Sequence, residues 1–152
     1  MARQYFERGD PGPIAAALAQ VPELLGPGMG FIAAVYGPGS LPARKREIVI
    51  LRTSARHGCR YCVAVHMRAA ARAGLTSAEV DDLRGAGEPA CDWSDSDRAL
   101  IEFSDRMSGN PAYAVDSLEA HFREHEIVEL VTLAAATIFL NRFSTALALP
   151  LP

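Results

Sequence analysis

The sequence predicts an all-α protein, on the strength of its composition and its hydrophobic pattern. Hydrophobic residues make up 49% of the 152-residue chain and aromatic residues only 7%, with abundant Ala and Leu, which suits closely packed helices better than a β-sandwich. No stretch alternates apolar and polar residues for long enough to predict a strand. Because the chain has neither an internal repeat nor a linker, we expect one compact helical bundle, a single domain over residues 1–152.

Two short helices are expected in the first part of the chain. Asp10 is a candidate N-cap for a helix that ends near residue 20, and Pro22 opens a second helix that runs to about residue 36. The Gly26-Pro27-Gly28 run weakens the prediction of this second helix, because glycine and proline both disfavour helix interiors.

The next predicted helix carries Glu47. Gly37-Pro38-Gly39 marks a break in the chain, after which Ser40 is a candidate N-cap for a helix that begins near Leu41-Pro42. The apolar run that follows Glu47 leaves little of this helix polar, as expected for an element covered on more than one side. Gly58 is expected to end or kink it.

A helix over residues 59–73 comes next, because Gly74 can adopt the left-handed conformation that closes a helix C-terminus. Thr76 and Glu79 have the spacing of a capping box, which predicts a short helix that ends near Arg84.

The loop over residues 85–93 contains the third cysteine, Cys91. No acid, base or second cysteine lies at helical spacing from Cys91, so we interpret it as a bystander thiol. Ser94, three residues before Asp97, is expected to cap the following helix, which Gly109-Asn110-Pro111 should end.

Two more helices are predicted, a short one over residues 118–125 and a long one over residues 126–148. The long helix is apolar nearly all round, so it is either the centre of the bundle or a contact between subunits. Its most apolar window, residues 128–140, is much shorter than the roughly 20 residues that span a bilayer. We therefore expect no membrane segment.

Charge and the polar start of the chain argue against several classes of partner. The net charge of -3 gives no footprint for nucleic acid, and the basic cluster Arg44-Lys45-Arg46 is expected to be a solvated helix face. The first residues lack the apolar segment of a signal peptide, so the expected compartment is the cytoplasm. Thiols are kept reduced there, which favours a catalytic or metal-binding role for a Cys-x-x-Cys pair over a structural one.

Residues 47–66 hold the candidate site, with two of the three cysteines, two of the four histidines and a carboxylate. If the segment from Cys59 onward is helical, Cys59, Cys62 and His66 share one face, within a sector of roughly 60°. Free N–H groups in the first turn of a helix favour thiolates. One thiol can then attack a substrate while the other resolves the intermediate.

His66 lies one turn beyond Cys62, where it can accept or return a proton. Glu47 is the candidate for orienting His66, because a short turn joins their helices and makes them expected antiparallel neighbours. Two other interpretations stay open. The four side chains are also zinc-ligand types, although no second Cys or His pair is present, and a histidine on an apolar helix can be an ordinary core residue.

The spacing resembles the signature of the alkylhydroperoxidase AhpD-like branch of the carboxymuconolactone decarboxylase superfamily: Glu, eleven residues, Cys-x-x-Cys, three residues and His. Here these are Glu47, Cys59, Cys62 and His66, with every spacing kept. The flanking segments also agree, namely residues 42–46, residues 71–76, Asn141-Arg142-Phe143 and Leu149-Pro150.

The resemblance implies an all-α fold and assembly as a homotrimer or homohexamer. It makes Cys62 the peroxidatic cysteine and Cys59 the resolving one, with Glu47 and His66 as a proton relay. Better studied members also have a histidine next to the peroxidatic cysteine, where this chain has Tyr61. A tyrosine hydroxyl can donate a hydrogen bond there but is a poor base at neutral pH.

The implied function is the dithiol-dependent reduction of a hydroperoxide, through a sulfenic acid on Cys62 and a disulfide with Cys59. An external dithiol must then reduce the disulfide, and for some members this is a lipoyl group on a carrier protein. The chemistry requires no metal and no bound cofactor. Two alternatives remain: cofactor-free decarboxylation or lactone chemistry, which does not rely on a cysteine pair, and a non-enzymatic oligomeric module whose thiols sense redox state or bind zinc.

Overall fold

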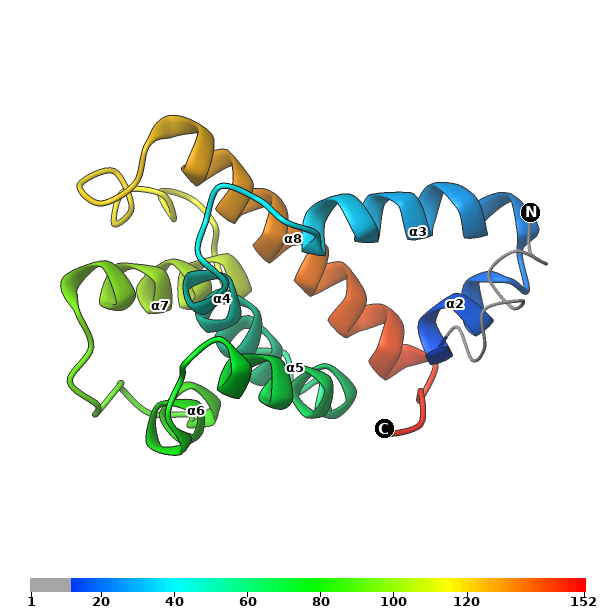
Figure 1. Ribbon diagram of the computed structural model, residues 1–152, viewed down its shortest axis with the longest axis horizontal. Coiled ribbons are helices and arrows are strands. Elements are labelled where there is room, and N and C mark those ends of the chain that lie inside the picture. Colours follow the sequence, from blue (N-terminus) through cyan, green and yellow to red (C-terminus); the bar gives the residue numbers. More distant parts are fainter. Residues whose placement is uncertain (1–11) are drawn as a thin grey trace.

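A computed structural model of the chain describes residues 12–152, and every regular element in that range is a helix (Figure 1). The prediction of an all-α fold is confirmed. Asp10, the candidate cap of the first helix, lies outside the described residues. The helices are α2 (Gly12–Leu18), α3 (Pro22–Tyr36), α4 (Ala43–Arg56), α5 (Arg60–Arg72), α6 (Ser77–Arg84), α7 (Asp95–Ser108) and α8 (Glu124–Ala146).

Helix α4 is central and contacts α5, α6, α7 and α8. In Figure 1 it lies between α7 and α8. Residues 48–54 are all buried, as the apolar run that begins at Ile48 predicts for a helix covered on several sides. Glu47 directly precedes this stretch and Ser54 is its last residue. Helix α4 therefore has a polar side chain at each end of its buried part.

The one charged residue of that stretch, Arg52, is fully buried and fully paired with Asp105. Its Nε and Nη2 donate to the two carboxylate oxygens of Asp105 at 2.7 and 2.8 Å. Nη1 donates to the carbonyl of Gly85 at 2.9 Å and Nη2 to that of Gly87 at 3.2 Å. Arg52 therefore holds α7 and the loop after α6 against α4.

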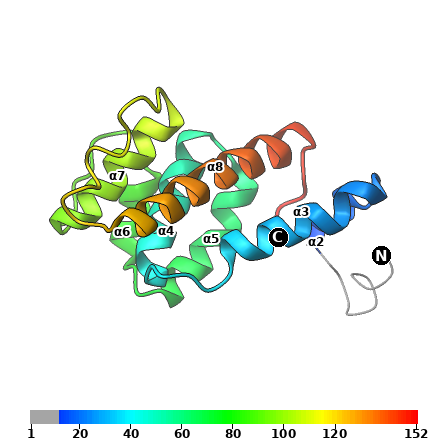
Figure 2. The same cartoon turned by 90° about the horizontal axis from the view of Figure 1, so that it is seen from above.

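Helices α2 and α3 form a smaller apolar cluster with the C-terminal part of α8, away from α6 and α7 (Figures 1 and 2). The predicted helix from Pro22 to about residue 36 is confirmed, and it continues through Gly26-Pro27-Gly28. The clash that proline makes with a preceding Cβ is absent at Gly26. Gly28 allows α2 to come close, since a Cβ there would lie 3.2 Å from Cδ1 of Leu18.

The predicted cap at Ser40 is also wrong. Pro42 flanks the start of α4 and makes no side-chain cap. The backbone N–H and the Oγ of Ser40 instead donate to Glu129 on α8, at 3.0 and 2.6 Å. Ser40 therefore bonds to a carboxylate that is distant in sequence, and not to a backbone N–H of α4 as its position predicts.

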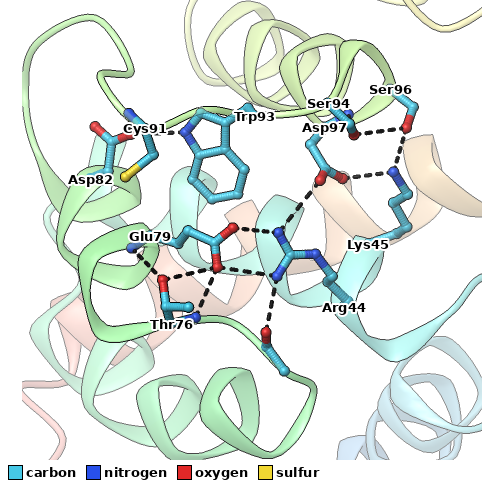
Figure 3. Close-up of polar contacts among 11 residues, drawn as sticks. Arg44, Lys45, Thr76, Glu79, Asp82, Cys91, Trp93, Ser94, Ser96 and Asp97 are labelled. Atoms are coloured by element: carbon cyan, nitrogen blue, oxygen red, sulfur yellow. Dashed lines mark hydrogen bonds and ion pairs between the residues drawn. The ribbon is translucent and has the colours of Figure 1, made fainter.

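The caps of α6 and α7 are confirmed, and both lie beside the start of α4 (Figure 3). Thr76 and Glu79 form a reciprocal capping box, and Ser94 accepts from the N–H of Asp97. Glu79 and Asp97 both turn towards Arg44, as Figure 3 shows.

The basic cluster at the start of α4 is therefore not a solvated face, and that expectation is wrong. Arg44 pairs with Glu79 at 2.6 Å, and Lys45 pairs with Asp97 at 2.6 Å. Arg46 donates to the carbonyls of Val35 and Gly37. These basic side chains hold neighbouring segments together.

Stability should depend on pH through Glu79. Its hydrogen bond from Arg44 is the main cause that lowers its pKa to about 2, from an ordinary 4.5. The ionised form is favoured by folding, so its contribution is complete above about pH 5 and is lost as pH falls towards 2. In urea unfolding, Glu79→Gln should be less stable than the wild type at pH 7, and the difference should shrink steadily between pH 5 and pH 2. A difference that is constant over this range would contradict the assignment.

The segment before α8 corrects the prediction of a short helix over residues 118–125. Residues 112–121 form successive turns, with Tyr113 in the left-handed region at φ 59°. Leu118 N–H donates to the carbonyl of Val115 at 2.8 Å, a bond that spans three residues and not four. Buried Ala114 and Leu118 anchor the segment through apolar contacts rather than through a regular helix.

Helix α8 begins two residues earlier than predicted and ends two residues earlier, at Ala146. By length and composition it could cross a membrane, a test that the core helices of soluble proteins also pass. Here α8 contacts α3, α4, α5 and α7, with Leu130, Leu133 and Ala134 fully buried against them. The side of α8 with Phe139 stays exposed.

Candidate active site

One tight turn joins α4 to α5 and places Cys59. Gly58 has φ +63°, the left-handed conformation that costs glycine least. The N–H of Gly58 donates to Ala55 and that of Cys59 to Ser54, both at 3.0 Å, which is the Schellman pattern of a helix C-terminus. Cys59 thus completes the end of α4 and is at once the N-cap of α5.

The two cysteines meet at the N-terminus of α5, joined as a disulfide with their Cα atoms 5.4 Å apart. The backbone N–H of Cys62 donates to Sγ of Cys59 at 3.2 Å. Cys59 is 1% exposed and Cys62 7%. The N–H groups at a helix N-terminus favour a negative charge. In α5 the N–H that bonds to sulfur donates to Sγ of Cys59.

One turn further along α5, His66 contacts Glu47 of α4. Nδ1 of His66 lies 3.0 Å from Oε2 of Glu47, and both side chains are largely buried. A carboxylate only accepts, so Nδ1–H is the donor and Nε2 is left for another partner. The antiparallel packing of α4 and α5 has therefore brought together two residues 19 positions apart.

Cys62 and His66 line a common cavity of about 70 Å³. Helices α2, α3, α4, α5 and α8 all contribute to its wall, with Ile14, Ile50, Val65 and Leu140 as its apolar part. Its polar residues are Tyr36, Ser54, Tyr61, Cys62, His66, Thr137 and Asn141. This volume holds a group of a few heavy atoms.

Tyr36 faces His66 with their ring centroids 5.9 Å apart. Thr137 donates its hydroxyl proton to the carbonyl of Leu133 at 2.8 Å. The 2.7 Å contact between Tyr36 Oη and Thr137 Oγ1 is therefore a donation by Tyr36. Burial is the main cause that raises the pKa of Tyr36 to about 12, so the hydroxyl keeps its proton at neutral pH.

Asn141 enters the cavity from α8. Its Oδ1 accepts from Oγ of Ser54 at 3.1 Å, a bond that identifies Nδ2 as the remaining donor of the amide. Nδ2 is buried and makes no hydrogen bond to any residue that the structure describes. A buried donor without a partner is destabilising, which is a reason to look for a ligand or a water at this point.

Tyr61, which stands between the two cysteines, is half-buried. It lines the cavity with Cys62 and also an open depression of about 290 Å³ formed with Ser144 and Leu149. Tyr61 therefore lies between the cavity and this depression.

The third cysteine lies elsewhere, beside Asp82 at the loop after α6 (Figure 3). Burial and the hydrogen bond with Asp82 raise the pKa of the Cys91 thiol, which lowers its thiolate fraction. Among residues 12–152, no group of three or more His, Cys, Asp and Glu side chains is arranged to hold a metal ion.

Tyr36, Ser54, Thr137 and Asn141 are not among the sequence-predicted site residues. Ser54 lies within residues 47–66, whereas the other three are distant from the cysteines along the chain. Asn141 lies in one of the flanking segments that carry the resemblance. It is also a polar residue that follows directly on the most apolar stretch of the chain, and such a residue is expected to have a buried partner.

Comparison with known proteins gives matches in sequence and in structure. The model of the carboxymuconolactone decarboxylase family matches residues 22–104, which include all five sequence-predicted site residues. Among curated proteins, the uncharacterised protein YdfG of Bacillus subtilis (strain 168) is 27% identical over 114 residues, covering 71% of this chain and 76% of YdfG.

Three crystal structures have the same fold. A protein of unknown function from Agrobacterium tumefaciens, provisionally named an antioxidant defence protein AhpD, is 24% identical with a TM-score of 0.79, over 90% of this chain and 95% of its own. A peroxidase-related protein from Ralstonia eutropha JMP134, with an alkylhydroperoxidase AhpD core, is 19% identical with a TM-score of 0.78, over 90% and 74%. A peroxidase-related protein from Silicibacter sp. TM1040 is 19% identical with a TM-score of 0.84, over 97% and 83%.

The family model covers more than half of the chain, and the structural matches extend over nearly all of it. At these identities the structural matches establish the fold and not the reaction. The chain belongs to the carboxymuconolactone decarboxylase family and has the fold of its AhpD-like members.

Proposed function

We propose that the chain reduces organic hydroperoxides, with Cys62 as the attacking thiol and Cys59 as the resolving thiol. The observation that carries the proposal is that Cys62 and a Glu47-bound His66 line one cavity, while Cys59 lies within disulfide reach of Cys62. The AhpD-like fold and the peroxidase-related names of two structural relatives are consistent with an antioxidant role.

The oxidative half proceeds in two steps. The Cys62 thiolate attacks the terminal oxygen of the hydroperoxide, the O–O bond breaks, and an alcohol leaves Cys62 as a sulfenic acid. The Cys59 thiol then attacks the sulfenic sulfur, forming the disulfide and releasing water. One hydroperoxide consumes two thiols, so atoms and electrons balance without any other oxidant.

His66 and Glu47 serve as the proton relay in this proposal. His66 takes the proton of the Cys62 thiol and returns it to the departing oxygen, while Glu47 fixes the ring and stabilises the imidazolium form. Tyr61 occupies the boundary of the cavity and contributes a hydrogen bond rather than a base.

The reductive half needs an external dithiol, for which a lipoyl group on a carrier protein is one candidate. Cys62 is the sulfur that such a dithiol would attack, because it is 7% exposed against 1% for Cys59 and lines the cavity. The leaving thiolate is then Cys59, which the N–H of Cys62 stabilises.

Assembly as a homotrimer or homohexamer is part of the proposal. Helix α3 has one charged residue, Glu23, yet Leu25 is its one fully buried side chain within a single chain. Leu24 and Phe31 on α3 and Phe139 on α8 are each about half exposed. A helix that is apolar all round is covered in a stable structure, and a second copy of the chain would cover this one.

The runner-up is the cofactor-free decarboxylation or lactone chemistry for which the matching family is named. In that reaction an acid or base, here His66 with Glu47, would protonate a carbanion and the cysteines would be dispensable. Activity on a carboxylated lactone that persists after both cysteines are replaced by serine would favour this alternative.

The proposed function is tested by counting thiols. The fully reduced chain has three free thiols, and one equivalent of an organic hydroperoxide should leave one, that of Cys91. An added dithiol should restore the other two. A chain whose thiols are unchanged by the hydroperoxide would contradict the proposal, and stoichiometric metal in the purified protein would favour zinc binding instead.

A further inference from the structure

Asn141 lines the cavity that Cys62 and His66 share, and its amide has an unused donor. The side chain is 1% exposed, and its Nδ2 has no hydrogen-bond partner among the described residues. Ser54 donates to Oδ1 at 3.1 Å, and in this orientation the NH2 group is the part of the amide that has no partner within residues 12–152.

An occupant of this cavity that carries a hydrogen-bond acceptor would give Asn141 its missing partner. Tyr36 does not supply one, because its hydroxyl contacts Thr137 and no hydrogen bond joins it to Nδ2 of Asn141. In the reduction of a hydroperoxide, negative charge develops on the inner oxygen, the one that carries the alkyl group, as the O–O bond breaks. An amide donor that is already oriented in the site stabilises such a charge, because it needs no reorganisation during the reaction.

We propose that Nδ2 of Asn141 donates a hydrogen bond to the inner oxygen of the bound hydroperoxide and stabilises the departing alkoxide. The inference rests on the proposed function. The S–O bond of the sulfenic acid forms at Cys62 as the O–O bond breaks, and both electrons of that bond leave on the inner oxygen. The alkoxide then takes from His66 the proton that the Cys62 thiol gave up, and it departs as the alcohol. Ser54 acts as a positioning residue for Asn141.

The test uses the full-length reduced chain and measures how fast Cys62 is oxidised by ethyl hydroperoxide. Asn141→Leu removes the donor at similar size and should slow this reaction roughly 10- to 100-fold. The rate at which iodoacetamide alkylates Cys62 should change by less than about twofold, because that reaction has no leaving alkoxide. Peracetic acid adds a second readout, since its leaving oxygen becomes a stable carboxylate and needs the donor less. Asn141→Leu should therefore lose less rate with peracetic acid than with ethyl hydroperoxide.

Ser144→Ala is the matched control, because Ser144 is also a buried, unpartnered polar residue of α8 but does not line this cavity. Its rate with ethyl hydroperoxide should equal that of the wild type. If Asn141→Leu does not fold, Asn141→Ala removes the donor without adding a charge, and Ser54→Ala frees the amide. Both variants should slow the oxidation of Cys62 by ethyl hydroperoxide and leave its alkylation by iodoacetamide nearly unchanged.

The outcomes separate the inference from the function on which it rests. A wild-type chain that ethyl hydroperoxide does not oxidise overturns both. A reactive wild type with Asn141 variants of equal rate, or with variants that lose the same factor with iodoacetamide and peracetic acid, overturns the role of Asn141 and leaves the proposed function standing. A selective loss with ethyl hydroperoxide supports the inference.

Discussion

Cys62→Ser should abolish the oxidation of the chain by a hydroperoxide, whereas Cys59→Ser should leave the first step intact. Cys62 lines the cavity with His66, so its loss removes the nucleophile itself. Cys59 lies at the end of the turn, 1% exposed and outside the cavity wall, where it can act only on the product of the first step. One equivalent of hydroperoxide should thus oxidise two thiols in the wild type, none in Cys62→Ser and one in Cys59→Ser.

The oxidation product distinguishes the two variants more clearly than the number of oxidised thiols does. Oxidised Cys59→Ser should hold a sulfenic acid on Cys62 that a 1,3-dicarbonyl reagent traps, with a mass increase located at that residue. Cys91→Ser is the control and should behave like the wild type, because Cys91 lies beside Asp82 and its raised thiol pKa lowers its reactivity. A trapped sulfenic acid on Cys59 in Cys62→Ser would reverse the assigned roles.

The local part of this structure could be predicted from the sequence, because short-range rules govern it. The left-handed glycines Gly58 and Gly74 end α4 and α5, and the Thr76 capping box starts α6, all as the residue types predict. The helical spacing of Cys62 and His66 places both on the cavity wall, and the turn at Gly58 gives them Glu47 as a neighbour.

What the sequence could not show depends on contacts between distant segments. Ser40 has the composition of an N-cap, but it bonds to Glu129 from 89 residues away. The sequence predicts a solvated helix face at Arg44 and Lys45, but acidic residues on α6 and α7 form ion pairs with both side chains. Asn141 and Tyr36 join the site only because α8 packs against α3, α4 and α5, which no spacing within one helix encodes.

The second large effect is expected for stability, at the pair formed by Arg52 and Asp105. Asp105→Ala should lower the free energy of unfolding by about 3–5 kcal/mol, because it leaves a fully buried guanidinium without its carboxylate. Burial raises the pKa of Asp105, but the hydrogen bonds from Arg56 and Arg52 outweigh it and keep the pKa below its ordinary value. The measurement is urea unfolding of each variant at neutral pH, with the slope of the transition checked for constancy.

Glu102→Ala is the matched control, three residues earlier on α7. Its pair with Arg106 is 2.8 Å long, but both side chains are about half exposed, so its loss should cost at most about 0.5 kcal/mol. A double-mutant cycle tests the cause of the stability loss in Asp105→Ala as well as its size. In an Arg52→Met background, Asp105→Ala should cost far less than in the wild type, since the buried charge is already gone. Equal costs in the two backgrounds would assign the effect to Arg56, which also pairs with Asp105, at the surface.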